Sequence, residues 1–164
     1  MNQGDIRAAL ASRPRDVLTC TLYGEASGEA RLSQIGVGCC IRNRVNLDLH
    51  HDGKPDWWGE GYAGVCLAPW QFSCWSELTA PNTQRVYALA ESMLAGAPPP
   101  RDPAVVATLS AIAAGIIDGA IPDVTSGATH YLTHYLLVTA PPKWARGQKP
   151  CAIVGSHTYF RLEA

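Results

Sequence analysis

The sequence predicts an α+β fold that is mainly helical and ends in a small antiparallel sheet. Three observations lead to this prediction. Apolar residues recur at helical spacing in four segments before residue 120, the last third is rich in β-branched and aromatic residues, and residues 152–161 alternate with the period of two that is typical of a strand. Helices followed by strands, with no internal repeat and no dividing linker, indicate one domain over residues 1–164 with its core at about 15–162.

The first two helices are expected on either side of a glycine-rich corner. Residues 15–25 follow a proline, which is a helix start signal, and residues 29–47 carry a wide apolar stripe. Ser27 and Gly28 are positioned to cap the second helix. Both glutamates of the segment LYGEASGEA therefore lie at this corner.

Two further helices follow. Pro81 opens the third, which extends to about Gly96 before the segment GAPPPRDP breaks it. Asp102 as N-cap and Pro103 as first helical residue start the fourth, and Gly119 ends it.

The segment between the second and third helices, residues 48–78, is rich in Gly, Pro and Trp and shows no periodicity. Such a long irregular segment in a small domain is usually functional, and aromatic side chains with polar neighbours suit the faces of sugar rings. The alternative is a long loop that its tryptophans hold over the core. Beyond residue 120, DVTSGATHYLTHYLLVTAPPKW favours strand or loop, and CAIVGSHTYFRLEA favours a short antiparallel hairpin.

Composition argues against several kinds of partner. With 47% hydrophobic and 16% charged residues the chain is globular, and a formal net charge of −1 without a long basic block argues against binding to nucleic acid. No apolar run approaches the roughly 20 residues that span a bilayer, so we expect no membrane insertion. The N-terminal segment lacks the basic leader and apolar stretch of a signal peptide, so we expect synthesis in the cytoplasm, and a monomer.

The six cysteines include no C-x-x-C pair, which argues against a zinc finger. We interpret the adjacent Cys39 and Cys40 as small core residues. If the protein reaches an oxidising compartment, Cys66 and Cys74 are the pair that we expect to form a disulfide. No other pair is assigned.

Glu25 is the candidate catalytic acid. A carboxyl group that protonates a glycosidic oxygen must be neutral at the working pH, which requires a partly apolar pocket that raises its pKa. Leu22 and Tyr23 precede Glu25, and small residues flank it, which fits such a pocket. Glu29 lies at the start of the second expected helix, where the helix dipole favours a carboxylate as a structural cap.

The number of catalytic carboxylates is left open. A glycosidase of the common types needs a second one, for which Glu29, Asp56, Glu60 and Asp123 are all candidates. If a hydroxyl of the sugar attacks in place of water, one carboxyl can serve first as acid and then as base.

Two other chemistries compete with this interpretation. His130 and His134 in THYLTHY have the i, i+4 spacing of zinc ligands on one helical face, although their neighbours favour a strand. In WQFSCW, Ser73 and Cys74 are candidate nucleophiles with His130 or His157 as base, but no G-x-S-x-G elbow surrounds Ser73.

Four motifs together resemble the SleB-type cell wall hydrolases, the spore-cortex-lytic family whose relatives also occur in phages. They are LYGEASGEA with IGVGCCIRNRV, then GVCLAPWQFSCW, PDVTSGATHYL and IVGSHTYF, in the family's order and over residues 18–160. The resemblance implies a lysozyme-like, lytic-transglycosylase-like fold without metal or cofactor. It also implies cleavage of the β-1,4 bond between N-acetylmuramic acid and N-acetylglucosamine, which leaves a 1,6-anhydromuramic end.

The resemblance also assigns roles to residues. The family's catalytic glutamate lies in the motif matched by YGEA, so Glu25 carries over as acid and base, and Glu29 is expected to bind substrate or support the second helix. Thr133 and His134 stand where relatives usually place an Asn-Pro-like turn. The glycan cleft is expected to be lined by residues of three further motifs: Gln71, Phe72 and Ser73 of QFS, Thr129, His130 and Tyr131 of ATHY, and His157 of GSHTYF.

The missing signal peptide and the absence of a peptidoglycan-binding repeat fit a phage or prophage endolysin released through holin lesions, or a virion-associated lysin, that acts on the glycan strands of peptidoglycan. Three alternatives stay open. They are a muramidase that hydrolyses the same bond with a second carboxylate, a zinc amidase centred on His130 and His134, and a non-catalytic glycan-binding module of a virion.

Overall fold

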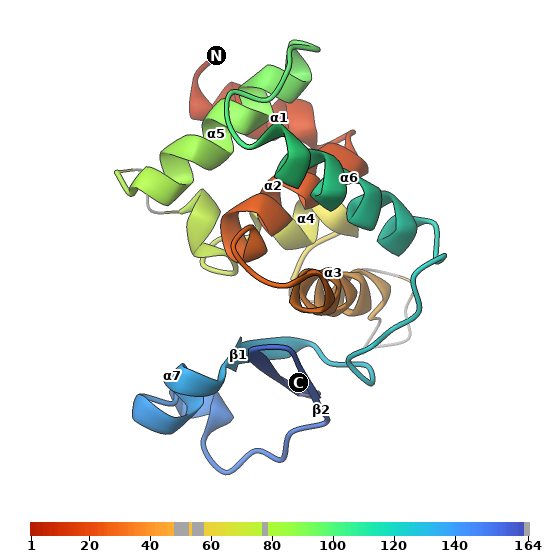
Figure 1. Cartoon of the computed structure of the whole chain (residues 1–164), viewed down its shortest axis with the longest axis vertical. Coiled ribbons are helices and arrows are strands. Elements are labelled where there is room, and N and C mark those ends of the chain that lie inside the picture. Colours follow the sequence, from red (N-terminus) through yellow and green to blue (C-terminus); the bar gives the residue numbers. More distant parts are fainter. Residues whose placement is uncertain (48–52, 54–57, 77–78, 163–164) are drawn as a thin grey trace.

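A helical part and a smaller sheet part make up the protein, and helix α3 (Arg31–Asn46) lies between them (Figure 1). The structure is a computed structural model that describes residues 1–47, 53, 58–76 and 79–162. The predicted α+β class, mainly helical with a small antiparallel sheet, is confirmed.

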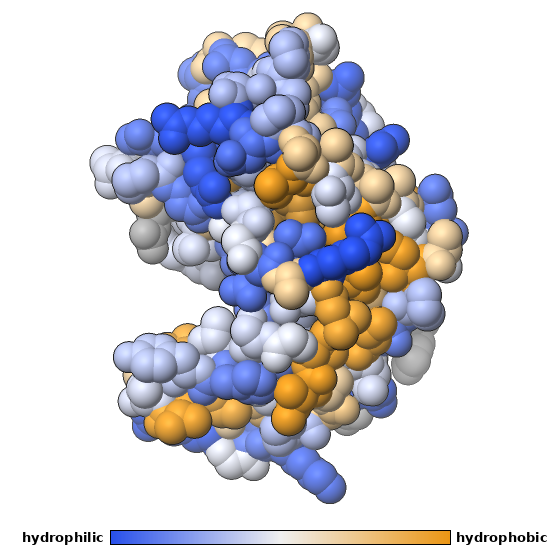
Figure 2. All heavy atoms as spheres, viewed as in Figure 1, coloured by the Kyte–Doolittle hydropathy of each residue, from blue (hydrophilic) through white to orange (hydrophobic). Residues whose placement is uncertain are grey.

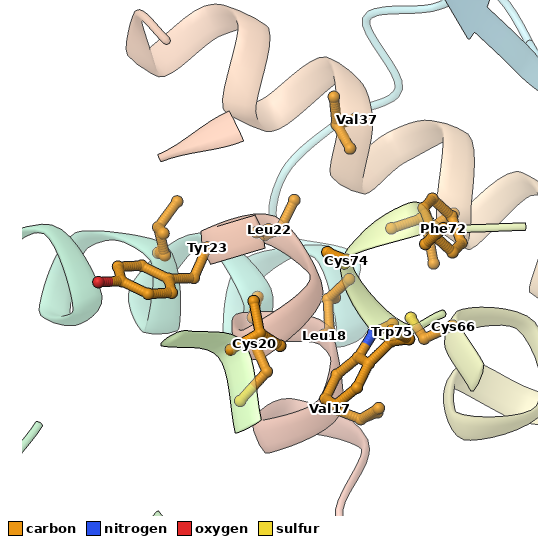
Figure 3. Close-up of a cluster of buried hydrophobic side chains, with 14 of the residues drawn as sticks. Val17, Leu18, Cys20, Leu22, Tyr23, Val37, Cys66, Phe72, Cys74 and Trp75 are labelled. Atoms are coloured by element: carbon orange, nitrogen blue, oxygen red, sulfur yellow. The ribbon is translucent and has the colours of Figure 1, made fainter. Parts of the chain in front are cut away.

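Helix α2 (Pro14–Ala26) is the centre of the helical part, and its predicted position is confirmed. Residues 17–23 are buried without interruption, because α2 contacts every other helix of this part. Those helices are α1 (Gln3–Leu10), α3, α4 (Gly61–Leu67), α5 (Pro81–Leu94) and α6 (Pro103–Ile117). Figure 3 shows α2 side chains packed against Cys74 and Trp75 of the 3-10 turn η1 (Ser73–Trp75).

Helices α3, α5 and α6 confirm the other three helical predictions, and one of the two predicted N-caps is wrong. The N-cap of α3 is Ala30, two residues beyond Gly28, and no side chain caps it. Asp102 is the N-cap of α6 and Pro103 its first residue, as predicted, but Asp102 lies in the left-handed region (φ 48°) and its side chain makes no capping hydrogen bond. Its carboxylate instead accepts a hydrogen bond from Tyr23 Oη at 3.0 Å, which ties the start of α6 to α2.

The remaining short helices were not predicted. Helix α1 precedes the first expected helix, and α4 and η1 lie within the segment that was expected to be irregular. Helix α7 (His134–Thr139) follows the first strand, and the 3-10 turn η2 (Lys143–Ala145) follows α7. All are at most eight residues long, too short for apolar periodicity to reveal them.

The sheet has the strand order β1-β3-β2, with both pairs antiparallel. Its strands are β1 (His130–Thr133), β2 (Ala152–Val154) and β3 (His157–Phe160), so the predicted hairpin is confirmed. The hairpin turns at Gly155, which has a φ of 56° and packs so tightly that an added Cβ would lie 1.9 Å from Ser33 Oγ of α3.

The alternation expected along β3 is not visible in its burial, since all four of its residues are buried. One face of the sheet packs on α3, where Tyr159 joins a cluster with Cys40. On the other face, Phe160 packs with Leu132 and Ala145 beneath the segment that contains α7 and η2. A strand covered on both sides loses the contrast between an inner and an outer face.

All six cysteines are free thiols in the structure, including Cys66 and Cys74, the pair expected to form a disulfide in an oxidising compartment. Both side chains are buried in the main core, but in different places. Cys74 lies against Gly24 of α2, whereas Cys66 packs near Thr21, about one turn earlier. Among the described residues, none of the helices has both the length and the apolar character needed to cross a membrane.

Candidate active site

A cavity of about 480 Å³ lies where the helical part meets the sheet part. Figure 2 shows that the molecule is hollowed between these two parts. The described residues that line the cavity come from both: Glu25, Arg44, Trp70, Gln71, Phe72, Ser73, His130, Tyr131 and Trp144. Six of the nine residues predicted for the site are therefore brought together: Glu25, Gln71, Phe72, Ser73, His130 and Tyr131.

Glu25 stands in the last turn of α2 and reaches the cavity from the core side. Its Oε2 accepts a hydrogen bond from Tyr131 Oη at 3.3 Å, while Oε1 is buried without a hydrogen-bond partner among the described residues. The neighbouring Gly24 allows η1 to approach, because a Cβ there would lie 2.4 Å from Cys74 Cβ. The small residue beside the glutamate thus lets the core close behind the carboxyl group.

Burial raises the pKa of Glu25 above its usual value. The thiol and main chain of Cys74, the Tyr131 hydroxyl and the positive charge of Arg44 oppose this rise without cancelling it. A buried carboxyl group with a raised pKa, and one oxygen still unpaired, is suited to deliver a proton to a bound ligand.

Tyr131 is the group that holds the Glu25 carboxyl in place from the sheet side. Its position in β1 faces Tyr159 of β3, and its ring packs edge-on against His157, with ring centroids 5.3 Å apart. Burial and the neighbouring Glu25 raise the pKa of Tyr131 well above its usual value. The hydroxyl therefore stays protonated and can act as a hydrogen-bond donor to the carboxylate.

Arg44, in the last turn of α3, is a cavity residue that sequence reasoning missed. Its side chain is buried, with Nε donating to the Thr129 main-chain oxygen at 2.6 Å and Nη1 donating to Gln71 Oε1 at 3.2 Å. The guanidinium also lies over the rings of Trp58 and Phe72, at 5.5 and 5.4 Å from their centroids. Arg44 thus joins the helical wall to β1, and a charged residue within the predicted apolar stripe of this helix was the available signal.

The segment between α4 and η1 forms the upper wall of the cavity. Phe72 is buried and anchors this segment, whereas Ser73 is exposed at the cavity surface. Trp70 was also missed as a site residue, although its side chain is 88% exposed and lines the cavity. Its backbone has a φ of 64°, which for a bulky residue costs about 1–3 kcal/mol of strain.

His130 begins β1 on the opposite wall. Its Nδ1 lies 3.0 Å from Thr129 Oγ1, and its ring packs against those of Trp58 and Trp144, at 5.7 and 5.0 Å. Burial, and secondarily the charge of Arg44, lower the pKa of His130 to about 4. The imidazole is therefore neutral at physiological pH.

The geometry argues against a zinc site built on His130 and His134. The two residues begin different elements, β1 and α7, so they do not lie on one helical face as their i, i+4 spacing requires for a zinc site. His134 Nδ1 lies 2.7 Å from Thr158 Oγ1, and no group of three or more His, Cys, Asp or Glu residues in the described part of the chain could hold a metal.

Three predicted site residues lie outside the lining of the cavity. Glu29 does not cap α3; its Oε2 accepts a hydrogen bond from Ser156 Oγ at 2.7 Å, which fastens the β2–β3 turn to the helical part. Thr129 is buried, with Oγ1 accepting from the Leu162 amide at 3.1 Å. His157 is buried behind Tyr131.

A second carboxylate is not found in the cavity lining among the residues that the structure describes. Glu29 is held by Ser156, and Glu60 is exposed at the start of α4. Burial alone would raise the pKa of Asp123, but hydrogen bonds from the backbone amides and side chains of its neighbours outweigh it and lower that pKa. Asp123 therefore acts as a structural acceptor, and Asp56 lies outside the described residues.

The alternative of a nucleophilic serine or cysteine gains no support from the geometry. Burial, and then the charge of Glu25, raise the pKa of Cys74, which keeps its thiol protonated and unreactive. Ser73 lines the cavity, but none of its described contacts joins its hydroxyl to His130 or His157.

The chain is similar in sequence to a known protein family and in fold to solved structures. The family model described as Cell Wall Hydrolase matches residues 28–160, a range that begins three residues after Glu25. No curated protein matches the chain. Two solved structures are similar to it, and both confirm the expected lysozyme-like fold.

The first is the catalytic domain of the Bacillus cereus SleB protein, with 23% sequence identity and a TM-score of 0.59, covering 90% of this chain and 89% of that one. The second is the catalytic domain of the germination-specific lytic transglycosylase SleB from Bacillus anthracis, with 22% identity and a TM-score of 0.58. This similarity covers 92% of this chain and 96% of that one.

Proposed function

The chain belongs to the family of cell wall hydrolases, enzymes that degrade peptidoglycan, and on this premise we propose that it is a lytic transglycosylase with Glu25 as its acid and base. The bond cleaved is the β-1,4 linkage between N-acetylmuramic acid and N-acetylglucosamine. One observation carries the proposal: Glu25, with a buried and unpartnered oxygen, is the carboxylate that the described cavity lining contains.

The reaction requires one carboxyl group in two protonation states. In the first step protonated Glu25 gives its proton to the glycosidic oxygen, the bond from that oxygen to C1 of the muramic acid breaks, and positive charge develops on the sugar ring. In the second step the Glu25 carboxylate takes the proton of the C6 hydroxyl while O6 bonds to C1. The products are a free 4-hydroxyl and a 1,6-anhydro sugar, no water is consumed, and Glu25 is again protonated.

The surroundings of Glu25 fit both steps. Burial favours the neutral carboxylic acid that starts the reaction. Once the proton has left, the Tyr131 hydroxyl and the charge of Arg44 stabilise the carboxylate. A hydrolytic muramidase of the common inverting or retaining types would need a second carboxylate roughly 5–9.5 Å away, and the described lining offers none.

Mass spectrometry of purified peptidoglycan tests the proposal. The wild-type protein, Glu25→Gln and a control variant, Glu91→Gln, are each incubated with peptidoglycan, with and without EDTA. Glu91 is a suitable control because it is an exposed glutamate of α5 that lies outside the cavity.

We expect anhydromuropeptides from the wild type and from Glu91→Gln, none from Glu25→Gln, and no effect of EDTA. Reducing ends in place of anhydro ends would show that the protein hydrolyses the bond and is not a lytic transglycosylase. Cleavage by Glu25→Gln would refute the role of Glu25. Inhibition by EDTA would instead support the alternative hypothesis of a metal-dependent amidase.

A further inference from the structure

Trp70 combines three properties that its role in the fold does not explain. It is the most exposed large apolar side chain in the described part of the protein, at 88%. It lines the cavity that contains Glu25, and its backbone has a φ of 64°, in the left-handed region. A single exposed apolar residue is ordinary, but a strained tryptophan at the mouth of a cavity is not.

Neither burial nor backbone geometry accounts for the choice of tryptophan at this position. An exposed indole gains almost nothing from the hydrophobic effect in the folded protein, and the left-handed region favours glycine or asparagine over a bulky residue. An indole that is left in water gains contact energy only when a ligand covers it.

The wall around Trp70 is built to hold it in position. The amide of the next residue, Gln71, donates to the Ala68 main-chain oxygen at 3.3 Å, and its side chain accepts the hydrogen bond from Arg44. Phe72 then enters the core, where it is 2% exposed. The main chain at Trp70 is thus held by its neighbours on both sides, so the segment that carries the indole is already in place when a ligand binds.

A second tryptophan lies in the sheet part of the cavity lining. Trp144 of η2 is half-buried and packs against His130 and Phe160, with ring centroids 5.0 and 5.6 Å away. The cavity therefore has an indole on each of its two walls, a fixed one on the sheet part and an exposed one on the helical part.

We propose that Trp70 is a stacking platform for a sugar ring of the glycan strand, beside the bond that Glu25 cleaves. This inference rests on the proposed function and adds a binding residue to it. Each N-acetylated pyranose ring of the strand has a face of C–H groups that can cover the indole, while its hydroxyl and amide groups can reach Gln71 and Ser73 at the same wall.

Binding is measured in a Glu25→Gln background, so that cleavage does not interfere. The probes are an N-acetylglucosamine tetramer and purified soluble glycan strands, with affinity from isothermal titration calorimetry. We expect Trp70→Ala to weaken binding at least about tenfold and Trp70→Phe to retain most of it. The matched control is Tyr135→Ala, which removes another exposed aromatic ring, 77% exposed, that lies outside the cavity lining.

Kinetics with Glu25 intact provide an independent readout. Trp70→Ala should raise KM with a smaller change in kcat, and it should leave the anhydro product unchanged. Its unfolding midpoint should equal that of the wild type or exceed it, because the exposed indole makes no core contact, so lost binding is not lost folding.

Unaltered affinity in Trp70→Ala would overturn the proposal. An equal loss of affinity in Tyr135→Ala would overturn it as well, because binding would then depend on any exposed aromatic side chain and not on the position of Trp70. Failure of the proposed function has a different signature, namely cleavage by Glu25→Gln or reducing-end products, which is read from the products by mass spectrometry and not from the affinities.

Discussion

Replacing Glu25 by glutamine should stabilise the protein at neutral and alkaline pH while it removes activity. Burial raises the pKa of Glu25 in the folded state, so within the window between the unfolded and the folded pKa the folded state binds more protons than the unfolded chain. The free energy of unfolding therefore falls as pH rises through that window. Below the window the carboxyl group is neutral in both states, and no such loss exists.

The magnitude follows from the contacts of the carboxyl group. Oε1 has no partner among the described residues, and Oε2 accepts one long hydrogen bond at 3.3 Å. Leaving a buried polar group unpaired costs about 1–3 kcal/mol when it is neutral and more when it is charged, and only this additional cost separates the carboxylate from the glutamine amide. The nearby thiol, hydroxyl and guanidinium recover part of it for the charged form. We therefore expect a gain of about 1 kcal/mol in Glu25→Gln above the window, which raises Tm by about 2–4 °C in a domain of this size.

Thermal and urea unfolding of the wild type, Glu25→Gln and Glu91→Gln at about pH 4 and about pH 8 measure this gain. The difference between wild type and Glu25→Gln should be small at the lower pH and favour the variant at the higher one. Glu91→Gln removes an exposed ion pair with the N-terminal amine, so it should gain no stability at the higher pH. A variant that is less stable than the wild type at the higher pH, or equally stabilised at both, would refute the argument from burial.

Three other substitutions test separate contacts. Gly24→Ala places a Cβ 2.4 Å from the Cβ of Cys74 and should lower the free energy of unfolding in urea by about 1–3 kcal/mol. The control is Gly28→Ala, whose Cβ meets nothing within 4 Å, and equal effects of the two substitutions would contradict the packing around Gly24. Tyr131→Phe removes a hydrogen bond that lowers the pKa of Glu25, so the alkaline limb of the pH–rate profile should move to higher pH, and an unmoved limb would show that this bond does not tune the acid. Arg44→Lys keeps the charge but loses the planar guanidinium that bonds to both Thr129 and Gln71, so we expect the free energy of unfolding to fall by about 1–3 kcal/mol. A variant as stable as the wild type would contradict a structural role for the guanidinium.

The parts of the fold that the sequence predicted well are those with local signals. Helices α2, α5 and α6 each begin at a proline, at Pro14, Pro81 and Pro103, and each has enough turns for apolar spacing to be visible. Helix α7 was missed, although its N-cap Thr133, which accepts a hydrogen bond from the Leu136 amide, is a residue type that commonly starts helices. The period of two in β3 was correctly assigned, although burial on both faces hides it in the structure.

The candidate site was predictable only where a motif marked it. Glu25 and the neighbours named by the resemblance fall in or next to the cavity, but the partners that shape it come from contacts between distant segments. Arg44 bonds to Thr129, 85 residues away, and Tyr131 bonds to Glu25 across 106 residues. Neither the spacing nor the composition of one segment contains such a pairing, and Trp70 was missed because its exposure depends on the folded surface.

The strand order has a consequence for how the enzyme matures during synthesis. The main core is made of residues up to 116, so the helical part can collapse while later segments are still being added. The cavity wall that contains Tyr131 cannot form until β3 is synthesised, because β1 pairs with β3, which comes last in the chain and lies in the middle of the sheet. We therefore expect a nascent or shortened chain that lacks residues 157–160 to form its helices but no closed cavity, and to gain activity only with the final strand.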